Sequence, residues 1–297
     1  MGSLRVNNIS GAKWFISFVD DHTRVTWLFL VKEKSETKSF VQNFHKMIQT
    51  QFQAKLQILR SDNAKEYFNS ILGEYFRESG IVQQSSCIDT LQQNGVDEQK
   101  NRHLLEVARS VLFSMNVPKQ YWGEAILTAT YLINRMPSRV LQFKIPCQVL
   151  LSVFPHTRLI SSIPPKIFGS PAFVRIESQN RSKLDPKALK CIFIGYPATQ
   201  KGYKCYCPST RKFYASMDVT FFEKQPYYPN PTFRGRMVQS YKNAGSGTNP
   251  NPPNSRLFSP YQRTFLPLYP TKSIPTKPFI LPQQIVHPIQ HSVQLTH

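Results

Sequence analysis

Hydrophobic residues in the first 137 positions follow a strand-like period in some places and a helical period in others. Residues 14–19 and 25–31 are aromatic and β-branched runs on either side of a polar turn, which predicts a β-hairpin. From Ser35 onward apolar residues recur at helical spacing, and a short strand-like run follows at residues 55–59. The chain is therefore predicted to begin with two paired strands, a helix and a third strand.

The pattern becomes mainly helical after this third strand. Residues 67–78 have a helical period, and residues 81–82 are suited to a short strand. Asn94-Gly95 is typical of a turn, after which a long helix with one apolar face is predicted. A further helix is predicted within residues 118–137, between two prolines. The order β-β-α-β-α-β-α-α indicates an α/β domain, a mixed sheet flanked by helices.

The rest of the chain divides into three segments by composition. Residues 138–170 are rich in Pro and Ser with little periodicity, and are interpreted as a connector. Residues 171–225 contain five short strand-like runs separated by turns, which predicts a small all-β barrel or sandwich. Residues 226–297 form a Pro-rich basic tail. From Lys224 onward the chain carries thirteen of its 23 prolines, eight Lys or Arg and no Asp or Glu, so a disordered tail without a core is predicted.

Composition restricts the class of partner. The chain has 37 Lys and Arg against 17 Asp and Glu, and its formal net charge of +20 predicts a polyanionic partner, nucleic acid before an anionic membrane surface. No apolar run reaches the roughly 18 residues of a transmembrane helix, and the N-terminus has no signal core. The five cysteines form no C-x-x-C pair, which argues against a zinc knuckle or a disulfide framework and favours a reducing compartment, nucleus or cytoplasm.

Two carboxylates are the main candidates for chemistry. Asp62 follows the third predicted strand, Glu98 stands where the long helix is expected to begin, and 35 residues lie between them. Such a pair can converge on a divalent cation, although a site of this kind needs a third carboxylate from upstream. Each also has a structural alternative. Asp62 with Asn63 is typical of a turn, and Glu98 is typical of a helix N-terminus, where the helix dipole favours an acid.

Several polar residues near this pair have two interpretations. Lys100, Arg102 and Arg109 follow Glu98, and form either a solvated basic face or a set of contacts to DNA phosphates. Asn94, in the predicted turn, is either structural or part of a loop that touches DNA.

The small β domain offers two further candidates. Tyr203, Tyr206 and Arg211 either pack within the barrel or contact nucleic acid. Cys205 and Cys207 are interpreted as strand cysteines, because two ligands at this spacing do not make a zinc site.

Four longer motifs follow one another along the chain. They are Phe18-Val19-Asp20-Asp21-His22-Thr23-Arg24; Arg60-Ser61-Asp62-Asn63-Ala64-Lys65-Glu66-Tyr67; Thr90-Leu91-Gln92-Gln93-Asn94-Gly95-Val96-Asp97-Glu98-Gln99-Lys100-Asn101-Arg102; and the block from Lys183-Leu184-Asp185-Pro186-Lys187 to Asp218-Val219-Thr220-Phe221-Phe222-Glu223. Together they resemble the polyproteins of plant Ty1/copia-type retrotransposons. The resemblance covers about residues 2–225 and corresponds to the C-terminal part of an integrase catalytic core and the SH3-like domain after it.

The resemblance implies an RNase H-like core over residues 1–137, a connector over 138–170, an SH3-like barrel over 171–225 and the disordered tail. It also implies a D-D-E triad, in which Asp62 and Glu98 take the last two positions as catalytic residues and metal ligands.

The first triad Asp belongs to an H-S-D-x-x-G-P segment, and residues 1–4 stand where that segment should end. The triad is therefore expected to be incomplete. Asp20 and Asp21 are candidate substitutes, although they are expected at the far end of the next strand.

Three further departures from the family pattern surround Glu98. Leu91 stands where the family has Pro, Asp97 where it has Ala, and Gln99 where it has Arg. Asp97 adds a like charge beside Glu98, which is expected to disturb the site.

The function implied by the resemblance is DNA integration, that is, phosphodiester cleavage and strand transfer with Mg²⁺ (or Mn²⁺). Its partners are the element ends and target DNA, with RNA and a homo-oligomer as further partners. Because the first Asp is missing, weak or absent metal binding and little or no catalysis are expected, with nucleic-acid binding retained. The alternative is a non-enzymatic nucleic-acid-binding module or a decaying transposon relic.

A missing first strand also has a consequence for folding. In the family this strand is central, between the hairpin and the strand that ends at Asp62. Its absence is expected to leave two unpaired edges in the middle of the sheet, which invite aggregation or a substitute strand. Poor folding of this domain, or partial pairing by Leu4, Arg5 and Val6, is therefore expected.

Overall fold

The computed structural model describes residues 6–61, 70–85, 91–157, 163–177, 181–229 and 292–296, with the backbone alone at residues 70, 85, 91–98 and 292–296. These residues form two five-stranded sheets and the helices that cover the first of them. None of the helices in this described part is both long and apolar enough to cross a lipid bilayer.

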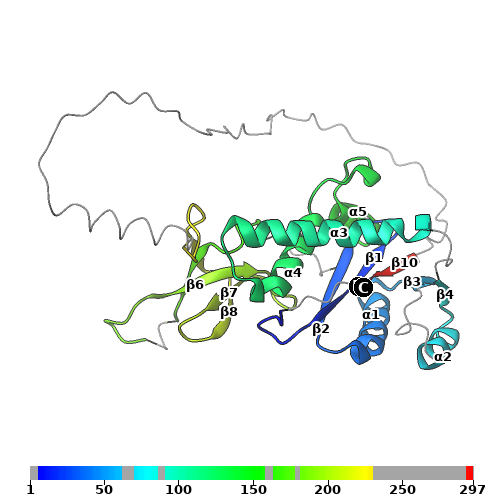
Figure 1. Cartoon of the computed structure of the whole chain (residues 1–297), viewed down its shortest axis with the longest axis horizontal. Coiled ribbons are helices and arrows are strands. Elements are labelled where there is room, and N and C mark those ends of the chain that lie inside the picture. The colour runs from blue at the N-terminus through cyan, green and yellow to red at the C-terminus, as the bar shows by residue number, and fades with distance from the viewer. Residues whose placement is uncertain are drawn as a thin grey trace, which may run out of the picture. The chain divides into compact units, whose positions relative to one another are not determined.

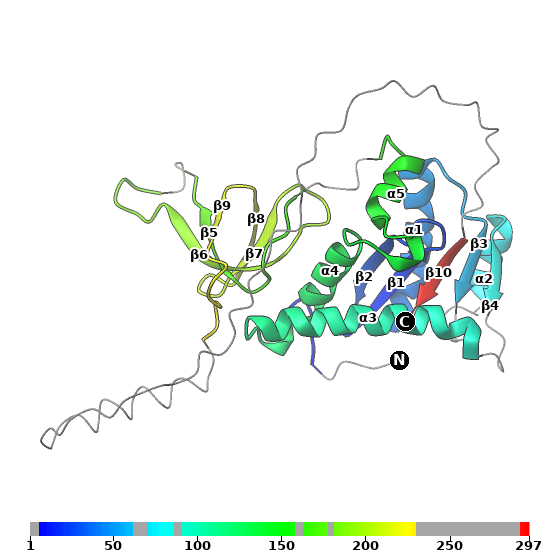
Figure 2. The same ribbon diagram turned by 90° about the horizontal axis from the view of Figure 1, so that it is seen from above.

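The first sheet is mixed, and strands that are far apart in the sequence lie side by side in it. The strand order is β2-β1-β10-β3-β4 (Figures 1 and 2). β1 and β2 form the predicted hairpin, and β3 and β4 are parallel. β10 is antiparallel to β1 and parallel to β3. The strands are β1 (Trp14–Asp20), β2 (Thr26–Val31), β3 (Ile58–Ser61), β4 (Val82–Ser85) and β10 (Ser292–Thr296).

The central position of β10 agrees with the predicted substitute strand, and it bears on the predictions for the open edges, the N-terminal segment and the tail. The edges of β1 and β3 are paired, because β10 forms a ladder with each of them. The N-terminal segment does not fill this place at Val6, whose carbonyl accepts a hydrogen bond from Trp122 Nε1 at 2.9 Å; Leu4 and Arg5 lie outside the described residues. The tail predicted to be disordered contains a strand at its end. Its backbone N–H and C=O groups find hydrogen-bond partners on β1 and β3, which a composition-based prediction does not take into account. The part of the tail over 230–291 lies outside the described residues.

Helices cover both faces of this sheet, and two of them differ from prediction. The elements are η1 (Lys34–Glu36), α1 (Thr37–Phe52), α2 (Ser70–Glu78), α3 (Leu91–Ser114), η2 (Lys119–Tyr121), α4 (Trp122–Ile133), η3 (Arg139–Leu141) and α5 (Pro146–Val153). α5 lies in the predicted connector and is anchored by the buried Cys147 and Leu150; its eight residues are too few to show a clear period. Asn94-Gly95 is not a turn but lies inside α3, since one glycine costs a helix only about 1 kcal/mol.

Alternate residues of β1 belong to the two cores on opposite faces of the sheet. Ile16 and Phe18 pack with α1, where the ring of Phe18 stacks on that of Phe44 with centroids 3.9 Å apart. Phe15 packs on the other core with residues of α3 and α4. Buried members of this second core include Leu28, Leu104, Tyr121, Trp122, Ala125 and Ile126. The mixed sheet with flanking helices predicted from sequence is confirmed.

The second sheet is the predicted small β domain. Its order is β8-β7-β6-β5-β9, with antiparallel neighbours throughout. The strands are β5 (Pro171–Arg175), β6 (Ala188–Gly195), β7 (Tyr203–Cys207), β8 (Lys212–Ser216) and β9 (Val219–Phe221). Its core is formed around Phe193, which contacts the rings of Tyr203 and Phe221 edge-on.

The small β domain is attached to α4 by a close approach and an ion pair. Gly195 at the end of β6 has φ +127°, and a Cβ there would lie 2.6 Å from Thr128 Oγ1, so this contact requires glycine. Lys204 Nζ on β7 lies 2.9 Å from both carboxylate oxygens of Glu124. The Glu124 side chain is only 5% exposed, whereas that of Lys204 is 28% exposed.

This asymmetry predicts unequal effects of removing the two partners. Lys204→Ala leaves a buried carboxylate unpaired and is expected to lower the free energy of unfolding by about 3–5 kcal/mol. Glu124→Ala leaves an ammonium that water can reach, so a smaller loss of about 1–2 kcal/mol is expected. Urea unfolding of both variants, with exposed Gln148→Ala as the control, measures the difference; equal losses would contradict the burial argument.

Candidate functional site

The two carboxylates predicted to act together are only partly placed. Asp62 follows β3 directly and lies outside the described residues. Glu98 lies in α3 by its backbone, and its side chain is not among those described. Since α3 begins at Leu91, Glu98 stands at the end of the second helical turn and not at the helix start. The helix dipole favours an acid only in the first turn, so it does not account for an acid at position 98. Whether the two carboxylates converge stays a prediction.

The segment of α3 after Glu98 is held against the sheet. Asn101 Oδ1 accepts a hydrogen bond of 3.3 Å from the hydroxyl of Ser17, a fully buried residue of β1. α3 also contacts β10. The helix that carries Glu98 therefore passes over β1 and β10, and of these two strands only β10 is a neighbour of β3.

Lys100 is not part of a freely solvated basic face. Burial, and then the nearby guanidinium of Arg24, lower the pKa of Lys100 to about 8. Arg24 is in the turn between β1 and β2 with φ +60°. Lys100 therefore lies at a packed, electropositive position, where a phosphate would relieve the repulsion between the two cations.

Arg102 and Arg109 differ from Lys100 in their surroundings, for both are exposed. They are seven residues apart, two helical turns, and so share one face of α3. Arg109 is eleven residues beyond Glu98, a helical rise of about 16 Å. Arg109 is thus the most distant of the three cations from Glu98, and contact of all three with DNA phosphates stays a prediction.

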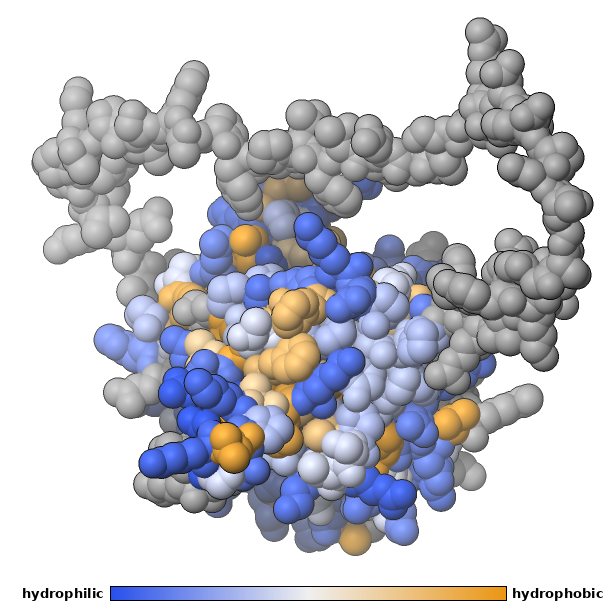
Figure 3. Space-filling view, turned by 90° about the vertical axis from the view of Figure 1, so that its left-hand side faces the viewer, coloured by the Kyte–Doolittle hydropathy of each residue, from blue (hydrophilic) through white to orange (hydrophobic). Residues whose placement is uncertain are grey.

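Arg109 instead borders a groove between α3 and α4 with a volume of about 390 Å³. Leu105, Leu112, Phe113 and Trp122 are among its apolar lining residues. Figure 3 shows one face of the molecule, on which hydrophobic side chains gather among hydrophilic ones.

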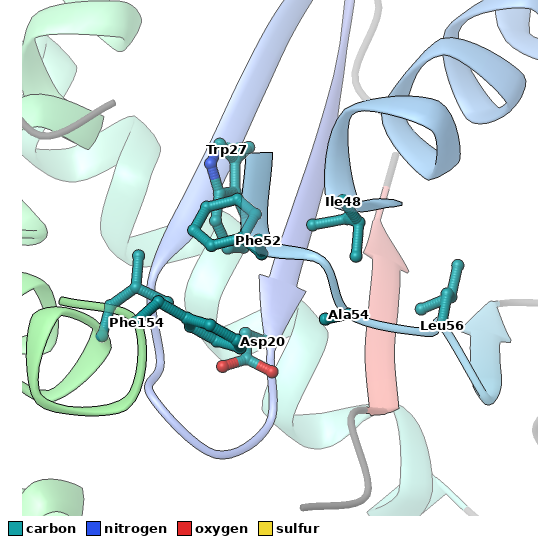
Figure 4. Close-up of a pocket in the computed structure, with 8 residues that line it drawn as sticks. Asp20, Trp27, Ile48, Phe52, Ala54, Leu56 and Phe154 are labelled. Atoms are coloured by element: carbon teal, nitrogen blue, oxygen red, sulfur yellow. The ribbon is translucent and has the colours of Figure 1, made fainter. Parts of the chain in front are cut away.

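Asp20 is committed to the structure of the hairpin. Its Oδ2 accepts hydrogen bonds from the backbone N–H of Thr23 at 2.9 Å and from its hydroxyl at 2.5 Å. The residue is 3% exposed and borders a small apolar cavity formed with Trp27, Phe52 and Phe154 (Figure 4). By register Asp20 pairs with Val293, which in turn pairs with Leu59, two residues before Ser61.

Asp21 is held by cations. Its Oδ2 lies 2.8 Å from Arg60 Nη1, and its Oδ1 lies 3.6 Å from Arg24 Nη1. Arg60 also donates from Nε to Gln84 Oε1 at 3.0 Å. These contacts give both aspartates structural roles in and beside the hairpin. This role of Arg60 was missed from the sequence, although Arg60 stands directly before Ser61 and Asp62 in the quoted motif.

The two metal ligands that the resemblance implies, Asp62 and the side chain of Glu98, are not among the described side chains. No group of three or more His, Cys, Asp or Glu side chains among the described residues could hold a metal ion. The strand in the central position, Ser292-Val293-Gln294-Leu295-Thr296, contains no carboxylate residue. This strand therefore supplies none of the carboxylates by which proteins hold Mg²⁺.

The two tyrosine candidates on the small β domain pack against other aromatic rings, whereas Arg211 is exposed. Tyr203 is buried against Phe193 and Phe221, and Tyr206 packs edge-on against Tyr121. These contacts agree with the packing interpretation of the two rings.

The strand cysteines agree with their structural interpretation. Cys205 and Cys207 are buried, and burial raises the pKa of the Cys205 thiol to about 12.

Comparison with known proteins gives three kinds of similarity. Residues 170–234 match the family model described as "Retroviral polymerase SH3-like domain". The chain is 38% identical over 75% of its length to the retrovirus-related Pol polyprotein from transposon TNT 1-94 of Nicotiana tabacum, and 32% identical over 93% of its length to that from transposon RE2 of Arabidopsis thaliana. A truncated transposon Ty1-A Gag-Pol polyprotein of Saccharomyces cerevisiae is 28% identical over 68% of the chain.

The chain spans only a small part of these relatives. It covers 16% of the TNT 1-94 polyprotein and 17% each of the RE2 and Ty1-A polyproteins. Among solved structures, the HTLV-2 integrase catalytic core domain in complex with magnesium is similar at a TM-score of 0.34 and 17% identity, over 44% of this chain and 80% of that one.

The low pKa of Lys100 predicts a pH-dependent stability difference. Folding lowers this pKa, so burial of the charged ammonium lowers the free energy of unfolding. The full effect is present below about pH 8, and it disappears as the pH rises toward 10. Lys100→Met is expected to raise the free energy of unfolding by about 1–3 kcal/mol at pH 7.5, with an advantage that shrinks between pH 8 and 10. Urea unfolding across this pH range measures the difference. Arg102→Met is the control, and its free energy of unfolding should change with pH in parallel with that of the wild type.

Proposed function

The chain is a homologue of the Pol polyproteins of Ty1/copia-type retrotransposons over the integrase core and the SH3-like domain, and we propose that it derives from a DNA-integrating enzyme and retains nucleic-acid binding without efficient catalysis. The observation that carries the proposal is the identity of the strand in the central position. The strand between β1 and β3 comes from residues 292–296 and has no carboxylate to complete a D-D-E triad with Asp62 and Glu98.

Loss of catalysis follows from the chemistry of the site. Phosphodiester cleavage and strand transfer by this class of enzyme use two divalent cations that activate the nucleophile and stabilise the leaving oxygen. In this proposal Asp62 and Glu98 are the remaining two ligands of an ancestral Mg²⁺ (or Mn²⁺) site, and binding to them is weak or absent. The hydrogen bonds of Asp20 and the ion pairs of Asp21 support this, because they give both residues structural roles in place of metal binding.

Nucleic-acid binding has separate support. The net charge of +20 is suited to a polyanion, and Arg102 and Arg109 expose two cations on one face of α3. DNA is the proposed partner, with RNA as the second candidate, and Lys100 and Asn94 complete the proposed contact set. A homo-oligomer and a nuclear or cytoplasmic location belong to the same proposal.

A second function from another class is favoured by the same strand. A non-enzymatic nucleic-acid-binding module requires an intact sheet but no metal site. A carboxylate-free strand that restores the sheet serves that module as well as it serves an inactive relic of integration.

The proposal of inactivity predicts the result of a strand-transfer assay. With a DNA substrate that carries the element ends and with Mg²⁺ or Mn²⁺, the 297-residue chain is expected to yield no joined product above background, because removal of metal contacts costs several kcal/mol of transition-state stabilisation. Glu98→Gln is the control. Joined product that Glu98→Gln abolishes would overturn the inactivity and restore the enzyme.

The proposal of binding predicts a salt dependence that two arginines control. Affinity for duplex DNA is expected to fall steeply between 50 and 200 mM salt, roughly as counterion release predicts. Replacement of Arg102 and Arg109 by Gln should reduce the slope of log affinity against log salt by about two.

The matched control for this binding test is Lys46→Gln/Lys55→Gln. It removes the same charge, and α1, which carries Lys46, packs on the opposite face of the sheet from α3. Affinity that is independent of salt, or equal effects of the two double variants, would contradict a phosphate-binding face on α3.

A further inference from the structure

We propose that the gap between β1 and β3 is a strand-acceptor site, and that the C-terminal segment of the same chain fills it as a clasp that completes the core. The inference goes beyond the proposed function and does not depend on it. A nucleic-acid-binding module, an inactive relic and an active enzyme would all need a continuous sheet.

The acceptor site is defined by the backbone of two strands. On one side Ser17, Phe18, Val19 and Asp20 pair antiparallel with β10 over four residues. On the other side Ile58, Leu59, Arg60 and Ser61 pair parallel with β10 over four residues. An occupant must therefore satisfy an antiparallel and a parallel ladder at the same time.

An empty gap would be costly because it lies at the centre of the fold. Phe18 is fully buried and Leu59 is 1% exposed, so both are core residues of the strands that border the gap. Without an occupant the facing N–H and C=O groups of β1 and β3 would lose their partners, and each unpaired buried group costs about 1–3 kcal/mol. α3 contacts β10 and so depends on an occupant as well.

The segment that fills the gap is suited to a strand by sequence. Ser292 to Thr296 alternates polar and apolar residues, and it includes the β-branched Val293 and Thr296. Between Pro250 and Pro288 the chain never continues for more than six residues without a proline, whereas the nine residues after Pro288 contain none. Proline lacks the backbone N–H that a central strand must donate. Within the part of the tail after Pro250, these nine residues are therefore the segment best suited to a central strand.

The length of the intervening chain allows this pairing within one molecule. The chain is anchored before it, where the N–H of Tyr227 donates to the Gly169 carbonyl at 3.1 Å and the hydroxyls of Tyr228 and Tyr121 are 2.9 Å apart. The 62 residues from 230 to 291 have a maximum reach of about 200 Å. A tether of this kind gives an effective concentration of the order of millimolar, so at micromolar protein the molecule's own strand outcompetes that of another copy.

Disulfide trapping in the full-length chain tests both the register and the origin of the strand. Val19 and Gln294 are direct partners, and Cα atoms of antiparallel partners are about 4.5–5.5 Å apart, which a disulfide can span. In a Cys87→Ser background, Val19→Cys/Gln294→Cys is expected to form a crosslink under mild oxidation. The other four cysteines are buried. The control is Val19→Cys/Gln284→Cys, which places the second thiol ten residues before its partner position.

Each outcome of the trapping decides the proposal. A crosslink within one chain, formed several-fold faster than in the control, supports the clasp. Crosslinked dimers as the main product would mean that copies exchange strands, and would overturn pairing within the molecule. A rate equal to that of the control would show that this register does not form.

Amide hydrogen exchange gives a second measurement without cysteines. Leu295→Pro removes a ladder donor from the clasp, whereas Gln284→Pro adds a proline before it. Exchange at the amides of β1 and β3 is expected to accelerate at least tenfold in Leu295→Pro and to remain as in the wild type in Gln284→Pro. Unchanged protection in Leu295→Pro would overturn the clasp.

Discussion

The structure depends on the backbone pairing at the centre of its first sheet. β1 and β3 are not neighbours and join only through β10. Both strands lie between buried cores, so the amide and carbonyl groups that each directs along the sheet toward the other have no access to water. These groups must find hydrogen-bond partners in the protein. The hairpin, the parallel pair and the helices on both faces form one layer structure only while that central position is occupied.

α3 transmits this constraint to the candidate site. The helix lies over β1 and β10, where Asn101 bonds to Ser17 and Lys100 is packed near Arg24. The residues after Glu98 thus have structural contacts that are independent of metal chemistry. A homologue can keep this helix for the stability of its fold after the reason for its carboxylates has gone. The same holds for Asp20 and Asp21, which stabilise the hairpin and its approach to Arg60.

Elements whose side chains repeat over several turns or along a whole strand could be predicted from the sequence. The hairpin, α1, α4 and the strands of the small β domain agree with their patterns to within a few residues. Short or interrupted patterns failed: α5 has eight residues, and the glycine at position 95 concealed the first turn of α3. For the site, Arg102 and Arg109 could be found as exposed cations, whereas the burial of Lys100 depends on the turn that carries Arg24.

The sequence by itself indicated the resemblance to retrotransposon Pol polyproteins, the mixed α/β sheet and the small β domain, since motifs and local periods carry these properties. Only the tertiary structure decided that Ser292–Thr296 takes the central place. An open sheet edge pairs with a strand through backbone hydrogen bonds, and every residue except proline offers the same backbone donor and acceptor. A local sequence pattern therefore cannot predict which strand, more than two hundred residues away, will pair with this edge.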